Sequence, residues 1–158
     1  MRHRMGAAAT VGLVIILTLA GLLAAALLGK VVLRSLEGPL SARIAAALPP
    51  EAILRSDLTA NCFGVASRGV WQVRGNGALV LARDGLHFFM FLPADHRHVP
   101  LGAIQGLSFR KSFLGKATIY DLLVVDFEAD GRADSAAWLL RDPRGWRAAI
   151  ERLQAGDA

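Results

Sequence analysis

The chain has 158 residues, of which 54% are hydrophobic and 20% are charged, with a formal net charge of +5 and one cysteine. Once an apolar segment near the N-terminus is set apart, the remainder suits one domain with its own core rather than two. The basic excess is too small to indicate a nucleic-acid-binding protein, and the single thiol excludes an internal disulfide.

A short basic N-terminus, residues 1–5, precedes a charge-free apolar run over residues 6–29. A helix rises about 1.5 Å per residue, so this run reaches about 36 Å, more than the ~30 Å hydrocarbon core of a bilayer. A helix also satisfies its own backbone hydrogen bonds in lipid. Because Lys30 and Arg34 close the run as anchor flanks do, we predict a retained transmembrane helix over residues 6–33.

A cleavable signal peptide is the alternative interpretation of the same run. The small residues around Ala26 resemble a cleavage site, and cleavage there would release a secreted, extracytoplasmic ligand-binding β-domain. Basic residues flank both ends of the run in nearly equal number, so the charge rule for orientation does not decide which side the domain occupies.

Residues 34–57 are expected to form a juxtamembrane stalk, with a short helix capped by Ser41 and ended by the Pro49-Pro50 pair. The periodicity then becomes strand-like, and residues 58–154 are predicted to form a β-domain that is followed by a tail at 155–158. Candidate strands cover residues 60–67, 70–74, 78–83, 86–92, 101–104, 106–113, 120–128 and 136–140. The polar residues 94–98 are expected to form a loop.

Two dipeptides between candidate strands are typical of tight hairpin turns. Asn76-Gly77 and Asp84-Gly85 both combine a residue that tolerates positive φ with a glycine, as a type I′ turn requires. The sequence therefore predicts an antiparallel meander in this region.

The C-terminal segment switches to a helical period. Asp142 can cap a helix whose first residue is Pro143, and Trp146, Ile150 and Leu153 recur at spacings of four and three. One amphipathic helix of this kind can cover the open end of a strongly bent sheet.

About seven strands followed by one helix resemble the pleckstrin-homology-like (PH-like) fold, particularly bacterial PH-like and GRAM-like membrane proteins. The resemblance covers about residues 58–154 and rests on hairpin and spacing patterns: RGNGALVLARDGLHFFMFLP (74–93), VPLGAIQGLSF (99–109), LLVVDF (122–127) and WLLRDPRGWRAAIERL (138–153). It implies a mainly β domain, an antiparallel sandwich or partly open barrel capped by a C-terminal helix. The first hairpin holds only Arg68 and Arg74, so the resemblance implies no particular lipid headgroup.

Two groups of residues are candidates for contact with lipid or a protein partner. Phe89 and Phe91 give their strand a second apolar face, which the stalk, the C-terminal helix, a partner or lipid must cover. In the segment SFRKSFLGK, basic residues surround an apolar tip, as in a loop that dips into a bilayer or in a strand end whose aromatic residue is core. Its candidate contacts are Arg110, Lys111, Phe113 and Lys116.

Catalytic and metal-binding motifs are not apparent in the sequence. Asp95, His96 and His98 resemble a metal-binding cluster, but Arg97 lies between the two histidines, so a solvated loop is expected. There is no P-loop, nucleophile elbow or dinucleotide fingerprint. Cys62 is expected to be a small packing residue. We therefore expect no enzyme activity, cofactor or metal; an enzyme would need polar groups that converge in a cleft.

These features together predict a single-pass membrane protein whose PH-like domain is a binding or scaffolding module near the bilayer. Its expected partners are a protein or anionic lipid headgroups, and no nucleic acid. The resemblance favours the cytoplasmic side of the cell membrane for the β-domain.

Overall fold

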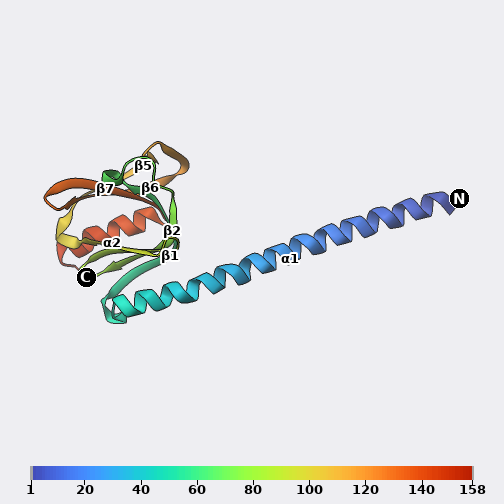
Figure 1. Cartoon of the computed structure of the whole chain (residues 1–158), viewed down its shortest axis with the longest axis horizontal. Coiled ribbons are helices and arrows are strands. Elements are labelled where there is room, and N and C mark those ends of the chain that lie inside the picture. The colour runs from blue at the N-terminus through green and yellow to red at the C-terminus, as the bar shows by residue number, and fades with distance from the viewer. Residues whose placement is uncertain (1, 158) are drawn as a thin grey trace. The chain divides into compact units, whose positions relative to one another are not determined.

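The computed structural model describes residues 2–157, and the side chains of residues 11–29 and 38–157. The chain forms two compact units, Met1–Pro39 and Leu40–Ala158. Helix α1 (Arg2–Ala47) runs through the first unit and into the second (Figure 1). Within it, Val11–Gly29 is a stretch of 19 residues long and apolar enough to cross a membrane, which fits an anchor and fits a signal sequence equally.

Helix α1 is continuous, which differs from the separate helical pieces expected around Ser41. Pro39 lies inside the helix, and Ser41 is an internal residue rather than a cap. The leucine, alanine and arginine residues that follow Pro39 are strong helix formers, so the helical conformation continues beyond it. It ends at Ala47, just before Pro49-Pro50, as the prolines predicted.

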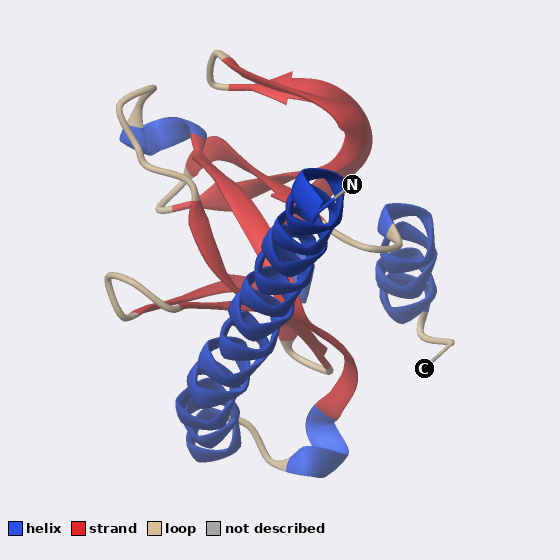
Figure 2. Cartoon of the chain, turned by 90° about the vertical axis from the view of Figure 1, so that its right-hand side faces the viewer, coloured by secondary structure: helices blue, strands red, loops and turns tan. Residues whose placement is uncertain are grey.

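The second unit contains a seven-stranded antiparallel sheet in the order β4-β3-β2-β1-β7-β6-β5. Helix α2 (Pro143–Ala155) follows the last strand, and this architecture confirms the predicted fold class. The strands are β1 (Ile53–Val65), β2 (Gly75–Ala82), β3 (Gly85–Met90), β4 (Asp95–Pro100), β5 (Ile104–Phe113), β6 (Lys116–Ala129) and β7 (Arg132–Leu139). Figure 2, with strands in red, shows how strongly the sheet bends.

Of the two predicted hairpin turns, one is confirmed and one is wrong. Asp84 lies in the tight turn between β2 and β3, and Gly85 begins β3. Asn76 and Gly77 lie instead within β2, paired with β1 and β3. A Cβ on Gly77 would stand 2.1 Å from the carbonyl oxygen of Phe89, so this glycine permits a close approach of β3 rather than a turn.

Other boundaries also differ from the sequence-based expectation: residues 101–103 form a 3-10 helix rather than a strand, and β6 and β7 each begin four residues earlier than expected. Residues 70–74 form a loop rather than a strand, and β1 begins at Ile53, five residues before the expected start of the domain at residue 58. Residues 95–100 form β4 rather than a loop. Strand β4 is at the edge of the sheet and exposes alternate side chains to solvent, which explains why its sequence is polar.

Helix α2 closes the bent sheet as its sequence predicted. Gly145 donates its backbone N–H to the Asp142 carboxylate at 2.9 Å, which caps the helix, and Pro143 is its first residue. The main core contains Trp146, Ile150 and Leu153 of α2. It also contains residues from all seven strands, on the inner face of the sheet. Figure 1 shows α2 with β5, β6 and β7 on one side and β1 and β2 on the other.

Strands β2 and β3 are buried on both faces. Their second face carries Ala78, Val80, Ala82 and Phe89. It packs against Leu40 and Ile44 at the C-terminal end of α1 and against Leu48, which follows the helix. Arg43 strengthens this contact by donating to the carbonyl oxygens of Met90 at 2.7 Å and Asp95 at 2.9 Å. Residues 40–48, which were expected to belong to a stalk, are therefore part of the folded domain.

This packing predicts a large effect of Ile44→Ala. Removing a buried isoleucine side chain leaves a cavity against β2, so we expect the free energy of unfolding to fall by about 2–5 kcal/mol. Denaturant unfolding of the full chain in detergent measures this loss. Ala46→Ser, at an exposed position on the same helix, is the control and should change stability by no more than about 0.5 kcal/mol. Equal stability of the two variants would contradict the packing.

Candidate binding surface

The loop between β1 and β2 presents large apolar side chains to solvent. After the short 3-10 helix Ala66–Arg68, the chain runs through Val70, Trp71 and Val73 before it enters β2. Trp71 is 95% exposed and Val73 is 88% exposed. Leu92, in the loop between β3 and β4, is 81% exposed. These three apolar side chains do not pack in the core, and exposed apolar groups of this kind mark binding sites for other molecules.

Gln72 holds this loop in place while its two neighbours point outward. Its side-chain carbonyl accepts the backbone N–H of Val65 at 3.1 Å. Its side-chain amide donates to the carbonyl oxygens of Val65 at 2.6 Å and Gly69 at 2.7 Å. While Gln72 is bound to β1 in this way, its two neighbours, Trp71 and Val73, are exposed to solvent. The exposure of these two residues is thus fixed by a defined loop structure.

The turn between β5 and β6 supports the same loop. Lys116 donates from Nζ to the carbonyl oxygen of Phe63 at 2.9 Å and also to that of Gln72. Arg74 lies 4.0 Å above the ring of Phe63 and donates to the carbonyl oxygen of Ala117 at 3.2 Å. Segments that are far apart in the sequence therefore meet at this end of the sheet.

A cavity of about 250 Å³ opens beside the exposed apolar residues, and three arginines line it. Its apolar wall includes Val73 and Leu92, and its charged wall holds Arg68, Arg74, Arg97 and Asp95. Asp95 accepts from Arg97 at 2.9 Å and lies 3.8 Å from Arg68. The lining thus holds one carboxylate and three guanidinium groups, so the cavity carries a net positive charge. We call the loops at residues 66–74 and 91–94, with this cavity, the arginine–tryptophan surface.

The charges of this cavity act on the pKa of Asp95. Burial is the largest single effect and would raise the pKa of this carboxyl group above its ordinary 3.8. The hydrogen bond from Arg97 and the positive charges of Arg97 and Arg68 together outweigh burial, so the pKa is lowered. The carboxylate is therefore ionised at neutral pH and orders two arginines.

The residues predicted to contact lipid or a partner are not all at the surface. Phe89 is buried beneath α1, and Phe113 is buried in a small core cluster with Phe63 and Leu122. Phe91 is half-buried against the residues that cover Phe89. The basic residues Arg110 and Lys111 are exposed on β5, whereas Lys116 is held by the two carbonyl oxygens described above.

The exposed residues of the arginine–tryptophan surface were missed by sequence reasoning. Val70, Trp71 and Val73 are β-formers, so the segment resembles a strand. The signal that could have exposed this error is Gly69, which precedes the segment and adopts a φ of 77°. A glycine of this kind marks an irregular connection before the chain re-enters the sheet.

The sequence cluster of Asp95, His96 and His98 is divided in the structure. Asp95 turns toward Arg97 in the cavity, whereas the two histidines lie on the other face of β4. There His96 and His98 stack against His87 of β3, with ring centroids 5.3 Å and 4.2 Å from it. The carboxylate beside His87 and His98 is that of Asp84.

Cys62 lies in the core, where it packs as expected. It is 2% exposed, and its thiol lies 3.7 Å from the carbonyl oxygen of Gly64. Burial raises the pKa of this thiol, because the low-dielectric core disfavours the thiolate. A neutral, buried thiol is unreactive.

Comparisons with known proteins show the fold alone. No protein-family model matches the chain. No curated protein matches it either. A chain in the solved structure described as "The 8S snRNP Assembly Intermediate" is similar to it, with a TM-score of 0.53 and 12% sequence identity. The match covers 68% of this chain and 85% of that one, so the β-domain architecture recurs in a very different sequence.

The lowered pKa of Asp95 predicts how acid changes stability. Because its pKa is lower in the folded than in the unfolded chain, ionised Asp95 contributes stability above its ordinary pKa of 3.8, and this contribution is lost as the pH falls through the folded-state value. Asp95→Asn should therefore lower the melting temperature at pH 7 and give a shallower decline in acid than the wild type.

Melting temperatures of the full chain in detergent between pH 7 and pH 3 measure this difference. Asp121→Asn, on β6 outside the cavity, is the matched control and should keep the wild-type slope. If Asp95→Asn and the wild type lose stability in parallel, the carboxylate does not order the arginines as described.

Proposed function

We propose that the chain is a single-pass membrane protein whose PH-like domain binds anionic lipid headgroups through the arginine–tryptophan surface. The domain acts as a non-enzymatic binding module at the bilayer that holds its anchor. The observation that carries the proposal is the joint exposure of Trp71, Val73 and Leu92 beside three arginines.

The apolar part of the surface suits the boundary between lipid headgroups and acyl chains. Moving a large apolar side chain out of water contributes about 1.5–3 kcal/mol. An indole is favoured at this depth because its ring is apolar and its N–H can donate to a polar group. Trp71 is ordered at the tip of the loop by Gln72, so little loop entropy is lost when it inserts.

The charged part of the surface suits an anionic headgroup. Each basic residue near a negatively charged leaflet contributes about 1 kcal/mol. Arg68 and Arg74 are exposed beside the apolar residues, and Arg97 lines the cavity between the two loops. The cytoplasmic leaflet carries the anionic lipids, which supports placing the domain on the cytoplasmic side.

Because the anchor already holds the domain at the membrane, a weak lipid contact is sufficient to orient it. Ten residues, 30–39, separate the apolar run from the first residue of the domain, and even fully extended they span at most about 36 Å. A connection this short keeps the domain at a high effective concentration near the membrane. A contact of a few kcal/mol then holds the domain in a defined orientation. The lipid contact therefore depends on an anchor that is retained rather than cleaved near Ala26.

Quenching of Trp71 by brominated lipids tests the proposal. The chain has three tryptophans, and Trp138 and Trp146 are buried, so Trp71 is the one that lipid can reach. We expect the full chain in nanodiscs with anionic brominated lipid to be quenched strongly, and Trp71→Phe to lose most of this quenching. Nanodiscs expose both leaflets, so the result does not depend on membrane orientation.

A matched pair of double variants tests the role of charge. Arg68→Gln with Arg74→Gln removes two cations before β2, whereas Arg83→Gln with Arg144→Gln removes two exposed cations away from this surface. The first pair should reduce the quenching of Trp71, and the second should not. Quenching that is equal in wild type and Trp71→Phe would refute lipid contact. Quenching of Trp71 that neither pair of variants changes would refute headgroup binding by these arginines.

A further inference from the structure

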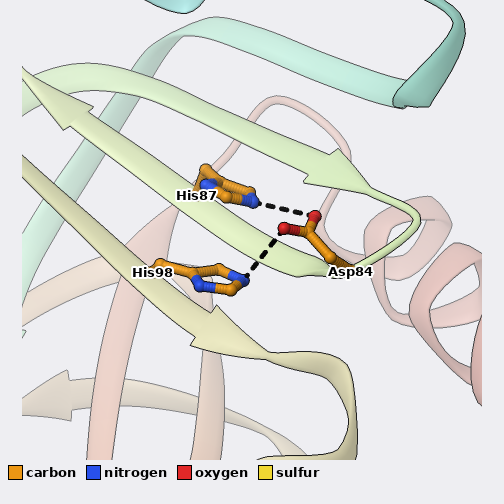
Figure 3. Close-up of side chains that lie close together, drawn as sticks. All are labelled: Asp84, His87 and His98. Atoms are coloured by element: carbon orange, nitrogen blue, oxygen red, sulfur yellow. Dashed lines mark hydrogen bonds and ion pairs between the residues drawn. The ribbon is translucent and has the colours of Figure 1, made fainter. Parts of the chain in front are cut away.

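A second polar site lies on the opposite face of β3 and β4 from the arginine-lined cavity. Asp84 is in the turn between β2 and β3, and His87 follows on β3. His98 is on β4, directly opposite His87 in the strand register. The two rings are stacked, and Figure 3 shows the carboxylate of Asp84 turned toward both of them.

The three side chains converge through atoms that can coordinate a metal ion. Nε2 of His87 lies 3.0 Å from one carboxylate oxygen of Asp84, and Nε2 of His98 lies 3.5 Å from the other. One ligand atom from each residue can be chosen so that all lie within 4.8 Å of one another. Zinc bonds of about 2.1 Å in a tetrahedron place ligand atoms about 3.4 Å apart. Asp84 and His98 are exposed, so small side-chain rotations bring the atoms to that spacing.

His87 is held in the orientation that coordination needs. It is only 4% exposed, and its other ring nitrogen, Nδ1, lies 3.1 Å from Nε2 of His96. In one neutral tautomer of His87, Nδ1 donates to His96 and Nε2 carries the free electron pair that a metal ion requires. An outer partner of this kind fixes the ring of a metal-binding histidine in known sites.

His96 is suited to be that outer partner. Its ring stacks on those of Phe89 and His87, with centroid distances of 4.2 Å and 5.3 Å. In the neutral tautomer that carries its proton on Nδ1, the Nε2 atom of His96 can accept the proton of His87.

The objection that the sequence raised against a metal site does not hold in the structure. Arg97 stands between His96 and His98 in the sequence, but its side chain lies on the other face of β4, in the cavity with Asp95. The ligand set also differs from the one the sequence suggested, because Asp84 replaces Asp95.

We propose that Asp84, His87 and His98 form a binding site for a divalent transition-metal ion, with Zn²⁺ as the best match. Two imidazoles and one carboxylate suit Zn²⁺ and not Mg²⁺ or Ca²⁺, which prefer oxygen ligands throughout. Three protein ligands leave a fourth position for water or another small ligand. The ion would join the β2–β3 turn to β4, the edge strand of the sheet. This site is independent of the proposed lipid contact.

Competition with a chromophoric chelator tests the site in the full chain in detergent. Every sample carries His3→Gln and no histidine tag, so His87, His96 and His98 are its only histidines. We expect one equivalent of Zn²⁺ to bind, and Co²⁺ to give the visible absorption bands of a tetrahedral site. Asp84→Asn and His98→Gln should each weaken Zn²⁺ binding by at least about tenfold. Asp121→Asn is the acidic control and should bind as the wild type does.

The two ligand variants should fold, because Asp84 and His98 are exposed, and circular dichroism verifies this. Zn²⁺ should also raise the melting temperature of the wild type and not that of either variant, because only the wild type binds it when folded. A folded wild type that binds no Zn²⁺ overturns the proposal. Zn²⁺ binding that survives both ligand variants overturns it as well.

Discussion

The structure depends on the burial of β2 and β3 on both faces. Their inner face belongs to the main core, which α2 closes with Trp146 and Ile150. Their outer face would expose Val80 and Phe89 if the C-terminal end of α1 did not cover it. An apolar strand with one uncovered face favours association with other chains. The last turns of α1 are therefore needed for the domain to be stable, and the segment from Leu40 cannot act as a free stalk.

The same arrangement assigns different chemistry to the two faces of the β3–β4 hairpin. Arg97 and Asp95 face the cavity beside Trp71, whereas His87 and His98 face outward toward Asp84. The alternation of side chains along a strand makes this separation possible within four consecutive residues of β4. The proposed lipid surface and the proposed metal site therefore use different side chains of the same hairpin.

The features predicted well from the sequence are those that depend on neighbouring residues. The Asp142 cap with Pro143, and the turn at Asp84, each depend on neighbouring residues alone. The loop around Trp71 was not predicted, because its β-forming residues are held out of the sheet by the bonds of Gln72 to β1. The grouping of His98 with Asp84 and His87 was not predicted either, because it follows from the strand register of β3 and β4.

Spin-label accessibility at residue 73 tests most directly whether the arginine–tryptophan surface touches the bilayer. Cys62→Ala removes the one native cysteine, and Val73→Cys or Arg144→Cys then carries the label on the full chain in anionic nanodiscs. We predict that the label at 73 collides more with oxygen, which concentrates in lipid, than with an aqueous nickel chelate, and that the label at 144 shows the reverse. Equal, water-like accessibility at both positions would contradict the account.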